Sequence, residues 1–243
     1  MMKQNGKRRW LAAVCICAVA AGALIVRGDI ATPRPRWSEV RMESEEVNIK
    51  LGKKKVYVEA LFNMHNTGSG SKVRFGYPLG LFEKELNDFK VYVEDKEIDG
   101  VGTEKTEEKK NSPRPVYGRG RGGKQNVQSE PYRFSGPYKE WKVFNVPFKA
   151  DEKKKIKVSY WVEPAVIDNT SHGKLNFYAY TLVTGATWKD TIKKAVINVK
   201  LDGVAAGDIL QTLPGDSEQK GNTISWTMKD FKPDKNIEIV YKP

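Results

Sequence analysis

The chain has 243 residues, of which 39% are hydrophobic and 30% are charged, with 42 Lys and Arg against 30 Asp and Glu. This composition is too apolar for a disordered chain and too polar for a protein that crosses a membrane many times. The two Cys and two His exclude most zinc, iron–sulfur and thiol chemistry, and we expect neither a metal nor a cofactor.

The first 31 residues predict a signal peptide or an N-terminal membrane anchor. Four cations among the first nine residues precede an uncharged run, residues 10–26, which is typical of secretory signals. As a helix this run spans about 25 Å, the lower limit for crossing a bilayer, so both cleavage and membrane contact through residues 10–26 stay open. Both cysteines, Cys15 and Cys17, lie in the run. The exported part therefore has no disulfide.

The rest of the chain shows the period-two alternation of β-strands. Spaced short strands predict an all-β protein, an antiparallel β-sandwich of two immunoglobulin-like domains, residues 32–133 and 134–243, preceded by one hydrophobic helix. A hairpin is expected at Gly52-Lys53-Lys54. The alternating apolar positions are Val47/Ile49/Leu51, Val56/Val58/Ala60/Phe62/Met64, Val73/Phe75/Tyr77, Phe89/Val91/Val93, Ile156/Val158/Tyr160/Val162, Ala195/Ile197/Val199/Leu201, Ile224/Trp226/Met228 and Ile237/Ile239/Tyr241.

Four segments depart from simple alternation. The apolar phase slips between Trp141 and Phe148, which predicts a β-bulge. Residues 79–87 could form a short helix, and residues 175–183 are apolar on both faces, as in a central strand. Residues 103–125 are charged and then rich in Gly, Pro and Arg, which predicts a long mobile basic loop.

Six segments carry a family resemblance, and the Thr-Gly-Ala-x-Trp piece is the most specific. They are Arg41–Ile49 with the alternating strand that follows to about Asn66, Phe75–Leu79, Leu86–Phe89, Trp141–Pro164, Tyr180–Trp188 and Asp230–Ile237. Together they resemble a bacterial extracytoplasmic family, domain-of-unknown-function family 4424. The resemblance covers nearly all of the exported chain. It implies an exported β-rich protein and supplies no activity.

The segment Thr184-Gly185-Ala186-Thr187-Trp188 predicts a strand end, a glycine turn and an aromatic side chain that fixes the turn on the core. The alternative is a ligand pocket lined by Trp188, Tyr178 and Tyr180. The structural interpretation is favoured, because buried aromatic side chains dominate core energetics.

Several sequence motifs of catalytic or cofactor sites occur in the chain, but the secondary structure or companion motifs that such sites need are missing. Gly118, Gly120 and Gly123 match G-x-G-x-x-G without the strand and helix that a dinucleotide site needs. Ser69-Gly70-Ser71-Lys72 and Ser171-His172-Gly173-Lys174 match S-x-x-K, but the glycines favour turns and the companion motifs are absent. His65 and His172 have no partner at metal-ligand spacing, and we expect both in turns or on the surface. We therefore predict that the protein has no catalytic residues and is not an enzyme.

Residues 32–243 carry 37 Lys and Arg against 29 Asp and Glu, a net charge of +8. The basic loop residues Arg114, Arg119, Arg121 and Lys124 could bind an anionic envelope polymer or lipid headgroups, although a merely solvated loop is the favoured interpretation of these charges. Export makes nucleic acid an improbable partner, and strand addition at a sheet edge is another possible mode of binding. The sequence therefore favours a non-catalytic binding or assembly module outside the cytoplasm. An envelope carbohydrate or peptide hydrolase and a passive structural domain are the alternatives.

Overall fold

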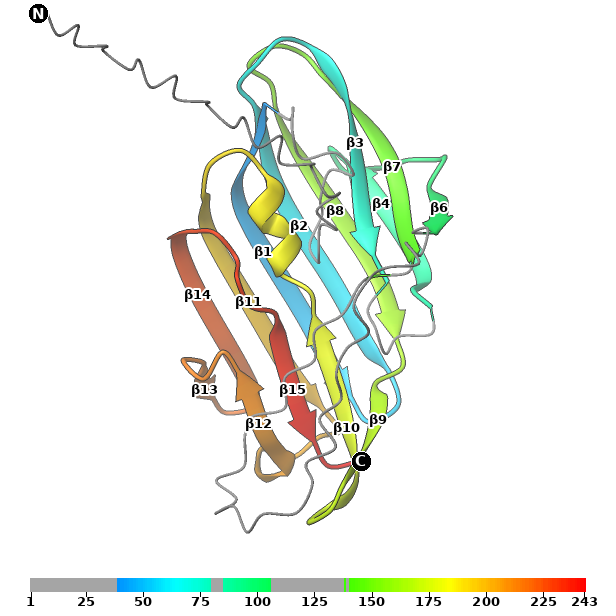
Figure 1. Ribbon diagram of the computed structural model, residues 1–243, viewed down its shortest axis with the longest axis vertical. Coiled ribbons are helices and arrows are strands. Elements are labelled where there is room, and N and C mark those ends of the chain that lie inside the picture. Colours follow the sequence, from blue (N-terminus) through cyan, green and yellow to red (C-terminus); the bar gives the residue numbers. More distant parts are fainter. Residues whose placement is uncertain (1–38, 80–84, 106–137, 139) are drawn as a thin grey trace, which may run out of the picture.

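The computed structural model describes residues 39–79, 85–105, 138 and 140–243, and these residues are mostly β-strand (Figure 1). Two 3-10 turns interrupt the strands, η2 (Val183–Thr187) and η3 (Ala206–Asp208). The predicted all-β antiparallel sandwich class is confirmed. The predicted N-terminal helix lies outside the described residues, within which no helix is long and apolar enough to span a bilayer.

The largest sheet has eight strands and forms one layer of the sandwich (Figure 1). All its neighbours are antiparallel except β1 and β11, which run parallel. In spatial order its strands are β13 (Glu218–Lys220), β14 (Thr223–Phe231), β11 (Ile192–Asp202), β1 (Val40–Gly52), β2 (Val56–Asn66), β8 (Lys153–Val162), β4 (Asn87–Val93) and β5 (Lys96–Glu97).

Two smaller sheets cover one face of this layer, and Figure 1 shows both in front of it. The first has the order β12 (Ile209–Leu213), β15 (Ile237–Tyr241), β10 (Gly173–Tyr180) and β9 (Ala165–Asn169). The second has the order β3 (Ser71–Pro78), β7 (Glu140–Phe148) and β6 (Gly102–Lys105). The expected central strand in residues 175–183 is β10, which lies between β15 and β9 and ends at Tyr180.

The predicted hairpin joins β1 to β2. Its turn closes with a hydrogen bond of 3.0 Å from the Gly52 amide to the Lys55 carbonyl. A Cβ atom at Gly52 would lie 2.6 Å from that carbonyl oxygen, so only glycine fits at this position.

The halves expected before and after residue 133 share the large sheet. β1 pairs in parallel with β11, from Ser44 opposite Lys194 to Gly52 opposite Asp202. β8 lies between β2 and β4. Because strands distant in sequence alternate in this sheet, the two halves form one sandwich rather than two side by side.

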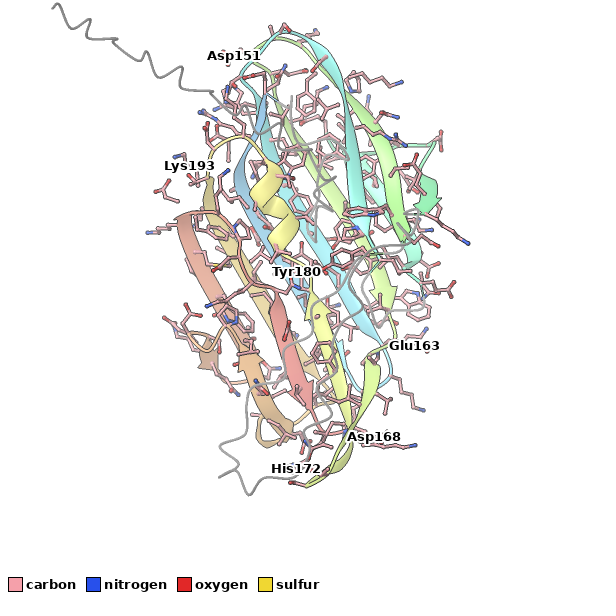
Figure 2. All side chains as sticks on the ribbon, in the orientation of Figure 1. Asp151, Glu163, Asp168, His172, Tyr180 and Lys193 are labelled. Atoms are coloured by element: carbon pink, nitrogen blue, oxygen red, sulfur yellow. The ribbon has the colours of Figure 1, made fainter. Side chains whose placement is uncertain are left out.

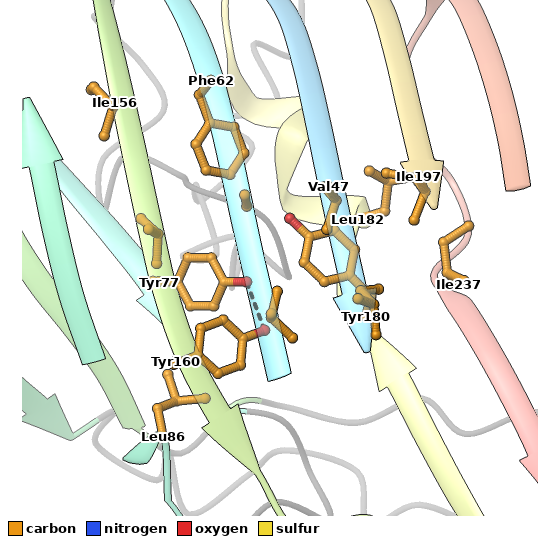
Figure 3. Packing of buried hydrophobic residues seen from close by; sticks show 14 of the residues in the cluster. Val47, Phe62, Tyr77, Leu86, Ile156, Tyr160, Tyr180, Leu182, Ile197 and Ile237 are labelled. Atoms are coloured by element: carbon orange, nitrogen blue, oxygen red, sulfur yellow. Dashed lines mark hydrogen bonds between the residues drawn. The ribbon is translucent and has the colours of Figure 1, made fainter. Parts of the chain in front are cut away.

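The facing sides of the three sheets enclose one apolar cluster, part of which is drawn in Figure 3. The period-two positions predicted for β1, β2, β8 and β11 point into it, since alternate strand residues share a face. Aromatic rings fill the part of this core that β3 covers. Phe75 stacks on Phe144 at 5.3 Å between ring centroids and contacts Trp188 at 5.1 Å.

Two hydrogen bonds between side chains lie within this core, where an unpaired polar group would be costly. The hydroxyls of Tyr77 and Tyr160 lie 2.9 Å apart (Figure 3). The Tyr180 hydroxyl donates to Glu45 Oε1 at 2.8 Å, and Glu45 is 1% exposed. A carboxyl group on β1 is therefore tied directly to β10 in the opposite layer.

The bulge predicted between Trp141 and Phe148 is wrong. β7 pairs with β3 without a register shift along its length, and the phase changes because both of its faces carry apolar side chains. Phe144 is buried in the core, whereas Trp141 points the other way and contacts the Tyr138 ring at 5.9 Å. Register shifts occur instead in β1, β4 and β12.

Two other local expectations fall at the margins of the described residues. Residues 103–105, expected in the basic loop, belong to β6, and the rest of that loop lies outside the described residues. Most of the short helix expected at residues 79–87 also lies outside them, although Asn87 already begins β4.

Candidate functional site

The side of the large sheet that faces away from the core carries polar and aromatic side chains. The register between adjacent strands places one polar residue from each of six strands side by side in a row. In order from β4 to β14 the row is Lys90, Ser159, Glu59, Asn48, Asn198 and Ser225. A second row, one pleat further along, places Trp161 beside Tyr57 and Lys50 beside Lys200.

These two rows line an open depression of about 700 Å³. It crosses five neighbouring strands, β4, β8, β2, β1 and β11, a distance of about 19 Å at the usual strand spacing. Its volume lies within the range of small-molecule sites, but its width suits an extended ligand better than a compact one.

Two aromatic residues form the apolar part of the depression. Tyr57 is 46% exposed and lies opposite the partly exposed Trp161 in the antiparallel register. The Trp161 indole nitrogen donates to Asp88 Oδ2 at 2.8 Å, and the Lys55 ammonium lies 3.8 Å from the centre of the indole ring. These two contacts hold the indole in one orientation.

An irregularity in β4 brings Asp88 to this face. The pairing of β4 with β8 shifts between Asn87 and Lys90, and Asp88 has a φ of 52°, an uncommon conformation that Asp tolerates better than most residues. Phe89, the next residue, points to the core side and contacts the rings of Tyr77 and Tyr160. The shift thus supplies a core aromatic and a carboxylate on opposite faces.

The amide groups of Asn48 and Asn198 meet at the centre of the polar row. Asn198 Nδ2 donates to Asn48 Oδ1 at 3.1 Å, because the parallel register places the two residues side by side. Each amide has both donor and acceptor atoms, so the pair keeps hydrogen-bonding capacity for a ligand.

The charged residues that line the depression are equal in number for the two signs. Three lysines, Lys50, Lys90 and Lys200, line it together with three carboxylates, Glu59, Asp88 and Asp202. Some of these charges are also paired with residues just outside: Glu59 lies 3.9 Å from Lys157 Nζ, and Lys90 lies 3.7 Å from Glu97.

A separate cluster surrounds His65 at the end of the sheet that Asp151 marks in Figure 2. His65 Nε2 lies 2.6 Å from Asp151 Oδ1, and Nδ1 lies 3.1 Å from Glu43 Oε1. Arg41 Nε donates to the same Glu43 oxygen at 2.7 Å. Both imidazole nitrogens are therefore engaged, and these contacts join the ends of β1 and β2 to the turn that precedes β8.

The pKa of Glu43 lies below its ordinary value. Burial opposes ionisation of this carboxyl group, but the hydrogen bonds to His65 and Arg41 and the charges of Arg41 and Lys153 outweigh it.

The two histidines differ from each other in exposure. His65 was expected in a turn or on the surface, and this expectation is wrong, since the residue is 8% exposed. His172 is exposed in the turn between β9 and β10, and Figure 2 places it at the opposite end from Asp151.

The structure places the predicted aromatic pocket residues in the core. Trp188 and Tyr178 are each 2% exposed and Tyr180 is 0% exposed. Trp188 follows η2, its amide donates to the Gly185 carbonyl, and its ring packs on Phe75. These contacts agree with the role of an aromatic that fixes the turn on the core.

The predicted anion-binding residues Arg114, Arg119, Arg121 and Lys124 lie outside the described residues, so that site stays a prediction. Both S-x-x-K matches within the described residues fall at turns that lead into β3 and β10, as expected. In the described part of the chain, no three His, Cys, Asp or Glu side chains are grouped to hold a metal ion.

Two residues of the depression could have been noticed in the sequence, because they are aromatic at strand positions that face away from the core. In Val56-Tyr57-Val58 and Tyr160-Trp161-Val162, a large aromatic occupies the outward phase of an amphipathic strand. Such positions are usually polar when the outer face is solvated. The juxtaposition of Asn48 and Asn198 had no such signal, because it depends on the parallel pairing of distant strands.

The fold and the site define an all-β sandwich with a wide, polar and aromatic depression on its larger sheet. A solved structure with a similar fold is that of a "putative nutrient binding protein" from Legionella pneumophila, with a TM-score of 0.61 and 15% identity, over 89% of this chain and 71% of that one. No family model matches the sequence, and no curated protein matches it.

A structure of an M1 zinc metallopeptidase from Deinococcus radiodurans matches with a TM-score of 0.38 and 8% identity, over 83% of this chain and 42% of that one. This chain thus spans less than half of the metallopeptidase. The similarity to the Legionella protein shows the fold, and the likeness to the peptidase is too low to carry an argument.

Proposed function

We propose that this protein is an exported, non-catalytic binding module of the bacterial cell envelope, and that it binds its partner in the depression on the outer face of the large sheet. The observation that carries the proposal is the exposed Tyr57 beside Trp161, whose indole is held in place by Asp88 and Lys55. Aromatic residues are enriched in binding surfaces, and this pair lies on a solvent-facing side of the sheet with its indole already oriented.

Three further observations support this proposal. The N-terminal charge pattern supports export. The similar fold in a protein described as nutrient-binding agrees in kind with a binding role. In the His65 cluster, both ring nitrogens already contact carboxylates, those of Asp151 and Glu43, which supports a structural task for this group of side chains.

The proposal is tested by co-sedimentation of the purified full chain with isolated cell-envelope fractions. The double variant Tyr57→Ala/Trp161→Ala should lose at least tenfold in affinity. Tyr92→Ala is the matched control, because Tyr92 lies on β4 outside the depression and contacts Lys157. Equal binding by the double variant and the native chain would refute the proposed site, and release of soluble fragments from the envelope would favour the hydrolase alternative.

An anionic envelope polymer or lipid headgroup remains a separate proposal for the basic loop. It follows from the net charge of +8 on residues 32–243 and from the affinity of arginine for phosphate oxygens. Neutralising Arg114, Arg119, Arg121 and Lys124 should reduce co-sedimentation with anionic vesicles or polymer and leave the melting temperature unchanged. Unchanged co-sedimentation would remove the loop from the mechanism.

A further inference from the structure

We propose that the ligand of this depression is a neutral carbohydrate chain that lies across the strands of the large sheet. This inference rests on the proposed function and specifies the chemical class of the partner. It draws on the aromatic pair, the polar row, the charge balance and the dimensions of the depression.

The aromatic pair supplies a stacking surface for sugar rings. The C–H face of a pyranose ring is apolar and packs against an aromatic ring, while the hydroxyls around its edge remain available for hydrogen bonds. Tyr57 is 46% exposed, and its register partner Trp161 presents a second ring on the same face. Because Asp88 and Lys55 already orient the indole, little conformational entropy is lost when a ligand packs beside it.

The polar row supplies partners for hydroxyl groups one pleat away. Asn48, Asn198 and Ser159 carry uncharged groups that both donate and accept hydrogen bonds, and Glu59 lies between Asn48 and Ser159 in the register. A sugar hydroxyl also both donates and accepts. A ring stacked on Tyr57 therefore has matching groups at its edge.

The charge balance separates a neutral glycan from a polyanion. Three lysines and three carboxylates line the depression, so the lining itself has no net charge. Lys55 on the Trp161 ring adds a single positive charge, which is a weak attraction for a phosphate-rich polymer. Tight binding of such a polymer would also bring its phosphates close to Glu59, Asp88 and Asp202. A neutral chain avoids this repulsion.

The dimensions favour several sugar units over one. The depression crosses five strands, or about 19 Å, and it is open rather than enclosed. A monosaccharide would cover only the aromatic pair. A linear oligosaccharide could reach from Asp88 on β4 to Asn198 on β11.

The test is a titration of the full chain, by calorimetry and by tryptophan fluorescence, with three probes. Two probes are neutral, the hexasaccharides of β-1,4-linked N-acetylglucosamine and of β-1,4-linked glucose, and the third is the polyanion polyglycerol phosphate. We expect at least one neutral hexasaccharide to bind, at least tenfold more tightly than its disaccharide and with little dependence on salt. Tyr57→Ala and Trp161→Ala should each weaken binding about tenfold or more.

Two variants sharpen the assignment. Trp161→Phe keeps an aromatic ring and should retain more affinity than Trp161→Ala, while Asn198→Ala should weaken binding a few-fold by removing one amide of the polar row. Tyr92→Ala serves again as the control and should bind like the native chain.

Three outcomes would overturn the carbohydrate assignment, and they differ in what they mean for the site. If only polyglycerol phosphate binds, and binding needs Tyr57 and Trp161, the ligand class is wrong but the site stands. If no probe binds while envelope binding still needs the aromatic pair, the same conclusion holds. If a hexasaccharide binds equally well to the double Ala variant, both the ligand assignment and the proposed site fail.

Discussion

Trp188 and Trp161 show how the same residue type serves two purposes in one sandwich. Trp188 is 2% exposed and packs on Phe75 between the layers. Trp161 lies on the outer face of the large sheet, where its contacts are a carboxylate and an ammonium group. The first residue gains its stabilisation from buried area, and the second keeps part of its surface available to a ligand.

The comparison teaches that stability and binding are separable in this protein. Strands β2 and β8 present core side chains on one face and the depression on the other, because successive residues alternate between faces. Substitutions on the inner face should therefore act on the free energy of unfolding, and those on the outer face on affinity. The following predictions test this separation, from the largest expected effect on stability to the smallest.

The largest effect is expected from Trp188→Ala. Removing a fully buried indole leaves a cavity and should lower the free energy of unfolding by about 3–5 kcal/mol, measured by urea denaturation. Trp188→Phe is the control and should recover part of the loss. A variant with unchanged stability would mean that Trp188 has no architectural role and would revive the pocket interpretation.

Tyr180→Phe should have the next largest effect. It removes only the hydroxyl that donates to the buried Glu45, and loss of a partner for a buried charged or polar group costs about 1–3 kcal/mol. Tyr241→Phe is a useful comparison, because the Tyr241 hydroxyl donates to the Gly52 carbonyl rather than to a carboxyl group. If Tyr180→Phe costs less than Tyr241→Phe, the tie between β10 and Glu45 contributes little.

Glu43→Gln should give a smaller loss that depends on pH. The pKa of Glu43 is lowered in the folded state, so its ionised form contributes stability above the unfolded pKa of about 4.3. That contribution is lost as the pH falls through the lower, folded pKa. The variant should thus be less stable than the native chain at pH 7, and the difference should shrink at pH 3. A difference that stays constant with pH would contradict the electrostatic origin.

The smallest effects on stability are expected on the outer face. Tyr57→Ala should change the free energy of unfolding by roughly 0.5 kcal/mol or less, as surface substitutions usually do, and Trp161→Ala by about 1 kcal/mol through its lost cation–π and hydrogen-bond contacts. Binding by these variants should nevertheless fall. If Tyr57→Ala instead unfolds the protein, the two faces are not separable.

Much of the fold was predictable because period-two alternation is a local property of each strand. Val47, Ile49 and Leu51 face the core as expected, and so do the apolar positions of β2 and β8. The bulge expected in β7 failed for the same reason, since a phase change cannot distinguish an inserted residue from a strand with two apolar faces. Trp141 and Phe144 lie on opposite faces of β7 and are covered by different neighbours. The local sequence pattern does not reveal which neighbours these are.

The candidate site was less predictable. Tyr57 and Trp161 are visible in the sequence as aromatics in the polar phase, but they are separated by more than a hundred positions, and only the pairing of β2 with β8 makes them neighbours. His65 was expected in a turn or on the surface, because its hydrogen bond to Asp151 comes from a distant hairpin that the local sequence does not reveal.

The amino-acid sequence by itself determined the all-β class, the inward face of most strands and the glycine turn at Gly52, because each follows from steric and solvation preferences of neighbouring residues. The tertiary structure decided that the two halves share one eight-stranded sheet and that the outer faces of five strands form a continuous depression. The physical reason is that strand order and register come from packing between distant segments. That packing brings Asn48 to Asn198 and Tyr57 to Trp161.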